Sequence, residues 1–210
     1  MKSIFSEIRS AVLITLILAV VCGGIYPLVV FGISQGLFPQ KANGSLIVDA
    51  QGSIRGSRLI GQPFSAEKYF HSRPSAAGNG YDSTSSGGSN LGPTSQKLRD
   101  SIAQNIADYR TQYGLATNAP VPADAVTASA SGLDPHISLQ NAELQAARVA
   151  KARGLALEQV RALMAQNTAQ ADLGVLGEPG VNVLELNLAL DAMGTSSTHQ
   201  AGLSLDRSRQ

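Results

Sequence analysis

The feature that most constrains the fold is a long uncharged stretch near the start of the chain. Residues 11–38 contain no charged side chain, and their first part is almost entirely Ala, Val, Leu and Ile. An α-helix rises ~1.5 Å per residue, so this stretch is longer than the ~30 Å hydrocarbon core of a bilayer but too short to cross it twice. A helix in a soluble core is rarely apolar on every face over such a length. We therefore predict a single transmembrane helix over residues 11–33.

A cleaved secretory signal is the main alternative for this stretch. Such a signal has an apolar region of only ~7–15 residues and then a small-residue cleavage site, whereas here the apolar run continues past Gly24 into IYPLVVFGI. Gly23, Gly24 and Pro27 mark a kink or a thin waist at which another helix can approach closely. We expect these three residues to form an interface with a partner inside the membrane.

The residues that flank the span predict its orientation. Lys2 and Arg9 precede it, whereas Lys41 is the only basic residue in the first stretch after it. Positive charge is enriched on the cytoplasmic side of membrane helices, so residues 1–10 are predicted to be cytoplasmic. Residues 34–193 would then form one domain outside the membrane, in the periplasm, and residues 194–210 a flexible polar tail.

The overall composition limits the classes of function. The chain has 210 residues, with 16 basic and 15 acidic side chains and a formal net charge of +1. This balance gives no electrostatic footprint for nucleic acid, so we predict no nucleic-acid partner. The residues after the span suffice for one domain of ordinary size. The single cysteine, Cys22, lies in the predicted span and cannot form a disulfide within the chain.

The pattern after the span predicts a mixed domain, so we expect an α+β fold behind a single N-terminal transmembrane helix. Two short apolar runs, Leu46–Val48 and Leu59–Ile60, are separated by glycines and predict a β-hairpin. Apolar periodicity and capping residues predict helices over residues 95–113, 139–153, 157–167 and 181–193. The second and third of these helices should form a helical hairpin, with Ser138 as an N-cap.

Two irregular segments separate the predicted elements. Residues 73–94 form a long loop of Gly, Ser, Asn and Pro, and loops of this length are either functional or flexible. Within it, residues 87–94 approach a phosphate-binding loop, but Pro93 stands where that motif needs its lysine. We therefore predict a rigid turn that leads into a helix. Residues 121–132 carry small side chains that permit close backbone approach, either to another element or to a partner.

Candidate catalytic residues are few. The histidines show no paired-ligand spacing and no HExxH motif, so we predict neither a metal site nor catalytic residues. The densest polar cluster includes Ser129, Asp134 and His136, which leaves open an anchored periplasmic hydrolase or a free-standing binding module. A simpler interpretation is a turn in which Asp134 and His136 cap the helix after Ser138. The cluster is also suited to a polar contact surface for a partner subunit.

Several strings occur in order along the chain: GSRLIGQPF at 56–64, YFHSRPSA at 69–76, SGGSNLGPT at 86–94, VPADAVTASASGLDPHIS at 121–138, RVAKARGL at 148–155 and GEPGVNVLELNLALD at 177–191. Together with the N-terminal span, they resemble the C subunit of the potassium-transporting Kdp P-type ATPase, the KdpC family. The resemblance covers nearly the whole chain, and only the tail after residue 193 is unmatched.

This resemblance implies a non-catalytic accessory subunit of an ATP-driven, high-affinity potassium uptake complex in the bacterial inner membrane. The implied partners are a channel-like potassium-binding subunit, a P-type ATPase subunit and a small single-span subunit. The family is also credited with raising the ATP affinity of the pump, and the matching glutamine here is Gln145. Because an outer domain and cytoplasmic ATP lie in different compartments, we expect any effect on ATP to pass through the complex. Asp134 and His136 are expected to contact a partner.

Overall fold

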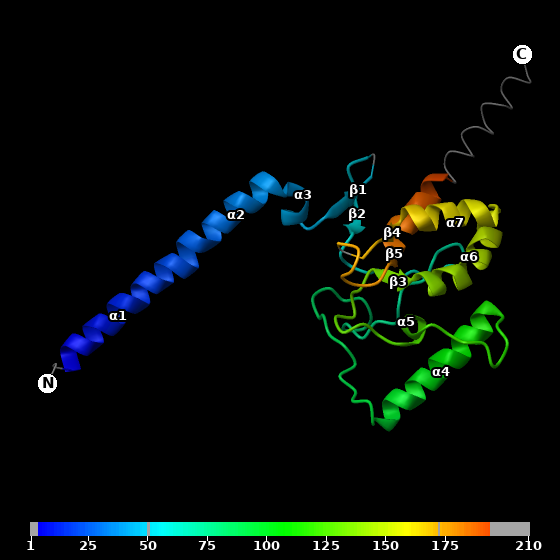
Figure 1. Ribbon diagram of the computed structural model, residues 1–210, viewed down its shortest axis with the longest axis horizontal. Helices are drawn as coiled ribbons and strands as arrows, with labels where there is room; N and C mark the ends of the chain where they lie inside the picture. Colours follow the sequence, from blue (N-terminus) through cyan, green and yellow to red (C-terminus); the bar gives the residue numbers. More distant parts are fainter. Residues whose placement is uncertain (1–3, 50, 172, 194–210) are drawn as a thin grey trace, which may run out of the picture. The chain divides into compact units, whose positions relative to one another are not determined.

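The chain divides into two compact units. The computed structural model describes residues 4–49, 51–171 and 173–193 (Figure 1), and the units meet between Ser57 and Arg58. The first unit holds a long N-terminal helix and a β-hairpin. The second holds the remaining helices and a small antiparallel sheet. This combination confirms the predicted α+β class with one N-terminal transmembrane helix. The predicted tail, residues 194–210, lies outside the described residues.

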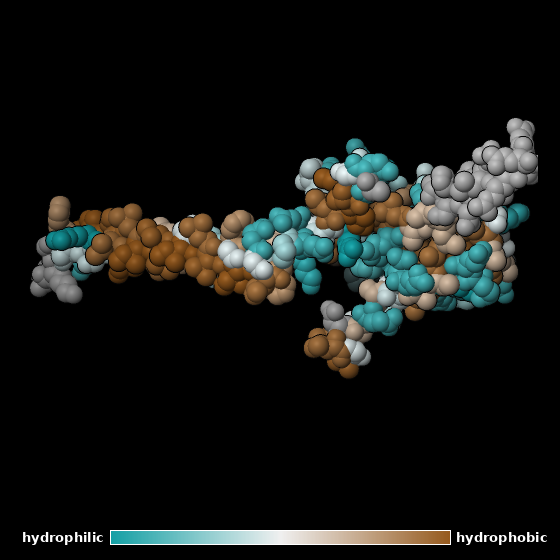
Figure 2. Space-filling view, turned by 90° about the horizontal axis from the view of Figure 1, so that it is seen from above, coloured by the Kyte–Doolittle hydropathy of each residue, from teal (hydrophilic) through white to brown (hydrophobic). Residues whose placement is uncertain are grey.

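The N-terminal helix is continuous and contains no buried residue. It consists of α1 (Ile4–Val20), a π-helical turn η1 (Val21–Ile25) and α2 (Tyr26–Leu37). Over its most apolar window the mean hydropathy is 2.5, and none of that window is buried against the rest of the chain. Figure 2 shows apolar residues along most of its surface. The predicted span, residues 11–33, lies inside this longer helix.

The π-helical turn lies where the sequence predicted a kink. Pro27 has no backbone N–H, so the α-helical bond that it would donate is missing. One residue earlier, the Tyr26 N–H bonds to the carbonyl of Val21, five residues back, which widens the helix locally. Gly23 and Gly24 both lie in this widened turn, and a Cβ atom added at either one would meet no atom of the chain within 4 Å.

The predicted hairpin is present, but its second strand begins earlier than expected. After the short α3 (Pro39–Ala42), β1 (Leu46–Val48) pairs antiparallel with β2 (Ile54–Ser57) rather than with the Leu59–Ile60 run. The reason is local, because the Asp49 carboxylate accepts the backbone N–H groups of Gln51 and Ser53 at 3.0 and 2.8 Å. This closes the turn immediately after β1.

The second unit is built on a helical hairpin and the helix over residues 183–193. α6 (Leu139–Arg153) and α7 (Leu157–Gln166) pack together as predicted. Ser138 caps α6 through its hydroxyl, which accepts the Asn141 N–H at 3.1 Å, and Gly154 ends it at φ 66°. Three short strands form the sheet in the order β3–β5–β4, with β3 at His136–Ser138, β4 at Thr168–Ala169 and β5 at Gly180–Asn182. The sequence had not predicted these strands.

The core lies where α6, α7, β3, β5 and the helix over residues 183–193 meet. Its apolar side chains are Phe70, Ile137, Ala142, Ala146, Val149, Ala150, Val160, Met164, Val181, Val183, Leu186 and Leu190. Phe70 is the only one of these that comes from outside the helices and strands just named. A segment without regular structure therefore threads into the centre of this unit.

α4 (Gln96–Tyr113) and α5 (Ala123–Val126) complete the second unit. Ser95 caps α4 and Gly114 ends it at φ 62°, close to the predicted limits of residues 95–113. α4 contacts α5 and α6, and its buried Tyr109 donates a hydrogen bond to Oδ1 of Asn141 in α6 at 2.9 Å. The turn at residues 93–94 leads into the helix, in agreement with the interpretation of Pro93.

The long loop over residues 73–94 is held against residues 129–132 of the same unit. Ser75 donates to the carbonyl of Gly132 at 2.6 Å, and the Gly87 N–H donates to the carbonyl of Ser131 at 2.9 Å. A Cβ atom added at Gly132 would lie 2.6 Å from the Ala77 nitrogen, so only glycine fits this approach. The small residues at 121–132 therefore permit close approach to another part of the same chain.

Candidate functional site

Gln145, the residue that the resemblance connects with ATP, is buried in the middle of α6. Its side chain is 1% exposed. Oε1 accepts the His71 backbone N–H at 2.7 Å and Nη2 of Arg148 at 3.2 Å. Nε2 donates to the His71 carbonyl at 3.1 Å and to Oδ1 of Asn141 at 2.9 Å. Both N–H groups and both lone pairs of the amide are thus engaged, which leaves no hydrogen-bonding group for a nucleotide in this conformation.

A second buried side-chain amide, that of Asn187, pairs in the same way with the backbone N–H and carbonyl of Phe70, the residue before His71. Asn187, in the helix over residues 183–193, is 1% exposed. Its Oδ1 accepts the Phe70 backbone N–H at 2.8 Å, and its Nδ2 donates to the Phe70 carbonyl at 2.9 Å. We call Gln145, Asn187 and the backbone of residues 70–71 the amide clamp. It satisfies buried backbone groups that would otherwise need a neighbouring strand.

Two arginines of α6 bind the backbone carbonyls of residues 67–69, which directly precede the amide clamp. Arg148 donates to the carbonyls of Glu67 and Tyr69, the latter at 2.8 Å. Arg153 donates to the carbonyl of Lys68 at 2.6 Å and forms an ion pair with Asp191 at 2.8 Å. The YFHSRPSA and RVAKARGL strings therefore meet in space. This contact was not predicted from the sequence, although Asn187 within the apolar run LELNLAL was a signal of a buried polar contact.

His71 lies beside the amide clamp, at the wall of a hollow of about 260 Å³. Its Nδ1 lies 3.1 Å from the Tyr113 hydroxyl, and its Nε2 lies 3.3 Å from the Ala66 carbonyl. Burial lowers the pKa of His71, and the nearby Arg148 guanidinium lowers it further. The ring is therefore held neutral, with Nε2 as the donor and Nδ1 as the acceptor.

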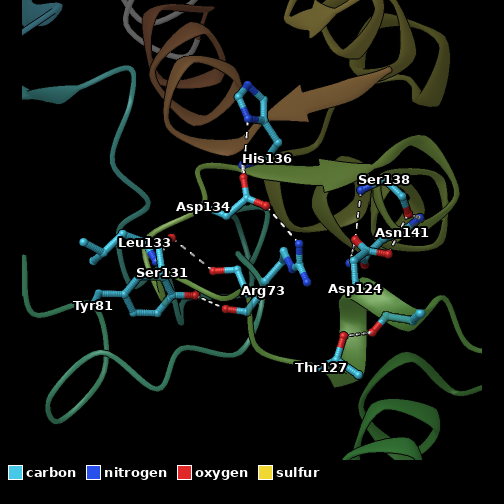
Figure 3. Close-up of polar contacts among 12 residues, drawn as sticks. Arg73, Tyr81, Asp124, Thr127, Ser131, Leu133, Asp134, His136, Ser138 and Asn141 are labelled. Carbon is cyan, nitrogen blue, oxygen red and sulfur yellow. Dashed lines mark hydrogen bonds and ion pairs between the residues drawn. The ribbon is translucent and has the colours of Figure 1, made fainter. Parts of the chain in front are cut away.

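Asp134 and His136, the residues predicted to contact a partner, lie together with Arg73 (Figure 3). Nη1 of Arg73 lies 2.9 Å from Oδ2 of Asp134, and Nδ1 of His136 lies 3.5 Å from Oδ1. Burial alone would raise the pKa of Asp134, but hydrogen bonds from His136 and the Arg73 guanidinium outweigh burial and lower the pKa to about 2. The carboxylate is therefore ionised, and the side chains of all three residues are part-exposed.

A wide, shallow hollow of about 680 Å³ runs beside this ion pair. Its wall is formed by Arg73, Asp134, Leu59 and the backbone around residues 128–131. The surface of this hollow is mainly apolar, with the Arg73–Asp134 ion pair at its edge. Such a surface is suited to a protein contact better than to the tight enclosure of a small molecule.

The expectation that Asp134 and His136 cap the helix after Ser138 is wrong in its main point. Asp134 does form a turn, since its Oδ1 accepts the His136 N–H at 3.0 Å. The support for the helix start comes instead from Asp124 in α5 (Figure 3). Its carboxylate accepts both the N–H and the hydroxyl of Ser138 at 2.8 Å, and Nδ2 of Asn141 at 2.9 Å.

The hydrolase alternative is not favoured by the geometry. Ser129 is buried, and its hydroxyl has the Ser131 hydroxyl as its hydrogen-bond partner, at 3.5 Å, rather than a nitrogen of His136. Asp134 is shared between His136 and the guanidinium of Arg73 rather than reserved for orienting the histidine. Across residues 4–49, 51–171 and 173–193, no group of three or more His, Cys, Asp or Glu side chains could hold a metal ion.

Comparisons with known proteins agree with one another over almost the whole chain. The family model KdpC, described as the K+-transporting ATPase, c chain, matches residues 8–192. The Potassium-transporting ATPase KdpC subunit of Koribacter versatilis is 53% identical over 87% of this chain and 92% of its own length. The proteins of the same name from Acidobacterium capsulatum and Mycobacterium tuberculosis are 56% and 49% identical, over 90% and 89% of this chain and 99% and 98% of their own lengths. The chain belongs to the KdpC family.

Proposed function

We propose that this chain is a non-catalytic accessory subunit of an ATP-driven potassium uptake complex. The observation that carries the proposal is the family match over residues 8–192, with relatives about half identical that are named as subunits of a potassium-transporting ATPase. The structures of the two units, each taken by itself, are compatible with such a role. One apolar helix supplies an anchor, and the polar groups of the second unit are engaged in holding its own backbone.

The partners that we propose are a channel-like potassium-binding subunit, a P-type ATPase subunit and a small single-span subunit. Inside the membrane, the π-helical turn with Gly23 and Gly24, and Pro27 just after it, would form the contact, because the turn lacks bulk and widens the helix. Outside the membrane, Asp134 and His136 would form part of the contact, beside the shallow hollow that Asp134 borders. The helix crosses the inner membrane with its N-terminus in the cytoplasm and the second unit in the periplasm, on the argument from Lys2 and Arg9.

Any influence of this chain on ATP is proposed to be indirect. The amide of Gln145 is buried and fully hydrogen-bonded within the chain, and no cofactor is proposed to bind to the chain itself. An outer domain can alter ATP affinity only as a coupling free energy transmitted through its partners. Gln145 would act in this coupling by keeping residues 70–71 in place.

Deletion of the gene tests the proposed function. The other subunits are kept, in a strain that lacks other potassium uptake systems. We expect loss of growth at low potassium, loss of ATP-driven uptake in vesicles and a complex that dissociates during purification. Expression of the wild-type chain from a plasmid should restore all three. Normal uptake by an intact complex without this chain would refute the proposal.

A further inference from the structure

The β1–β2 hairpin has an apolar face that no other part of its unit covers. Leu46 and Val48 are 48% and 53% exposed, and Ile54 is 63% exposed. Val48 lies directly opposite Ile54 in the pairing, and Leu46 lies two residues before Val48 on the same strand. The register shifts between Ile47 and Val48, where β2 has the extra residue Arg55. Because the extra residue is on β2, side chains still alternate along β1, and Leu46, Val48 and Ile54 share one face of the ribbon. An isolated two-stranded hairpin is only marginally stable in water, so we expect another surface to cover this apolar face.

Hydrogen bonds connect the hairpin to the end of the membrane helix within the first unit. The side-chain amides of Gln35 in α2 and Asn43 bond to each other at 3.2 and 3.3 Å. The Ser45 N–H donates to the Gln40 carbonyl at 2.9 Å. Ser57, at the end of β2, donates to the Gly44 carbonyl at 2.7 Å. This series of bonds runs from α2 through α3 to the hairpin and limits its distance from the membrane.

Exposed apolar side chains lie on both sides of the short segment that joins the helix to the hairpin. Leu37 and Phe38, at the exit of the helix, are 68% and 55% exposed. Only residues 38–45 separate α2 from β1, and α3 takes up half of them as a compact turn. Aromatic and aliphatic side chains at this level of a membrane protein commonly lie among the lipid headgroups and the first carbons of the acyl chains.

The charges of this region are compatible with a lipid surface. Residues 37–57 contain Lys41, Arg55 and Asp49 as their charged side chains. Asp49 and Arg55 form an ion pair at 2.8 Å, which compensates the one carboxylate that anionic headgroups would repel. Lys41 provides the excess positive charge, next to a hollow of about 280 Å³ lined by Pro39, Gln40, Asn43 and Leu46. Cationic side chains at this depth attract anionic lipid phosphates.

We propose that the β1–β2 hairpin is a membrane-surface element, with Leu46, Val48 and Ile54 inserted into the interfacial layer of the bilayer that its own helix crosses. The occupant of the apolar face is lipid, and the contact forms without any partner subunit. The hairpin would then fix the height and rotation of the helix in the membrane. This proposal does not depend on the identity of the transport complex.

Lipid-borne quenching of a fluorescent label tests this proposal on the full chain. In a Cys22→Ser background, single cysteines are introduced as Val48→Cys and Ile54→Cys on the apolar face, and each carries an environment-sensitive fluorophore. Ile47→Cys probes the opposite face of the same hairpin, and Lys97→Cys labels an exposed site on α4. Each chain is inserted alone into vesicles of phosphatidylcholine and phosphatidylglycerol that carry a nitroxide near the headgroup end of one acyl chain.

We expect the labels at residues 48 and 54 to lose most of their fluorescence to the nitroxide lipid. The label at residue 47 should lose less, and the label at residue 97 should be unaffected. Two results would overturn the proposal. In one, the labels at residues 48 and 54 stay accessible to an aqueous quencher in vesicles. In the other, they become shielded only after the partner subunits are added, so that the covering surface is protein. Agreement between the two apolar-face sites guards against a local folding defect in either variant.

Discussion

At the scale of single residues, the amide clamp explains why polar side chains occupy the centre of an apolar core. Gln145 and Asn187 are each 1% exposed, yet every hydrogen bond of Gln145 and both backbone bonds of Asn187 are made. Each side-chain amide pairs with the N–H and the C=O of one backbone residue, as a neighbouring strand would. An apolar residue of similar size at either position would leave two backbone groups buried without a partner.

The substitution Gln145→Ala should therefore destabilise the second unit strongly. It removes the partners of the His71 N–H and C=O groups and leaves a small cavity, so we expect the free energy of unfolding to fall by about 2–4 kcal/mol. Denaturant unfolding of the full chain in detergent measures this change. Gln140→Ala, at an exposed position in the first turn of the same helix, should change the free energy by less than about 0.5 kcal/mol.

The same pair of variants separates a positioning role of Gln145 from direct contact with ATP. If Gln145 acts by holding residues 70–71, the loss of ATP affinity in the assembled complex should accompany the loss of stability. Reduced ATP affinity in a Gln145→Ala complex whose unfolding is unchanged would contradict the indirect role.

Because of Asp134, the free energy of unfolding of the second unit should change with pH in the acid range. Its pKa is about 2 in the folded chain, below the usual value of 3.8, so its stabilising effect is complete above about pH 4 and is lost as the pH falls toward 2. With its side chain 30% exposed, we expect Asp134→Asn to lower the free energy of unfolding at pH 7 by about 1–2 kcal/mol. The difference from wild type should shrink between pH 4 and pH 2. Asp108→Asn, on the exposed surface of α4, is the control, and a difference that stays constant with pH would contradict the assignment.

At the scale of secondary structure, helices were predicted well because their ends carry local signals. Ser95 with Gly114 and Ser138 with Gly154 mark the limits of α4 and α6, and each cap involves residues close in sequence. The strands β3, β4 and β5 have two or three residues each and pair across long sequence separations, so no short pattern revealed them. The amide clamp was missed for the same reason, since it joins residues more than 70 positions apart.

Two glycines with similar backbone angles should respond differently to substitution. Gly154 ends α6 at φ 66° with open space around it, whereas Gly132 at φ 68° lies against the backbone of Ala77 and Gly87. Gly154→Ala should cost about 1 kcal/mol, and Gly154→Asn less, because asparagine tolerates the left-handed conformation. At Gly132, both substitutions should destabilise by more than 2 kcal/mol, since the added Cβ has no room. Thermal unfolding of the four variants measures this, with Gly92→Ala as the unstrained control. Rescue by Gly132→Asn would show that packing there is not limiting.

At the scale of the whole molecule, the π-helical turn is the feature of the membrane helix most suited to assembly. A Cβ atom added at Gly23 or Gly24 would meet no atom outside the neighbouring turns of its own helix, so Gly23→Leu with Gly24→Leu should leave the chain itself folded. We expect the double variant to lose co-purification with its partners, because the bulk blocks close helix approach. Gly36→Leu, also in open space on the same helix, should assemble normally. An intact complex with the double variant would reduce the helix to a passive anchor.

The orientation of the helix decides whether the second unit and ATP share a compartment. With Lys2 and Arg9 before the span and Lys41 after it, the charge bias favours a cytoplasmic N-terminus. Alkaline phosphatase fused after Lys41 should therefore be active, and green fluorescent protein fused at the same point should be dark. The same fluorescent protein fused to the N-terminus should fluoresce. The opposite pattern would put Gln145 on the side of ATP, where a direct contact would still require the amide to leave four hydrogen bonds. The indirect role thus has two independent supports, the predicted compartment and the observed burial of the amide, and the fusions test the first without disturbing the second.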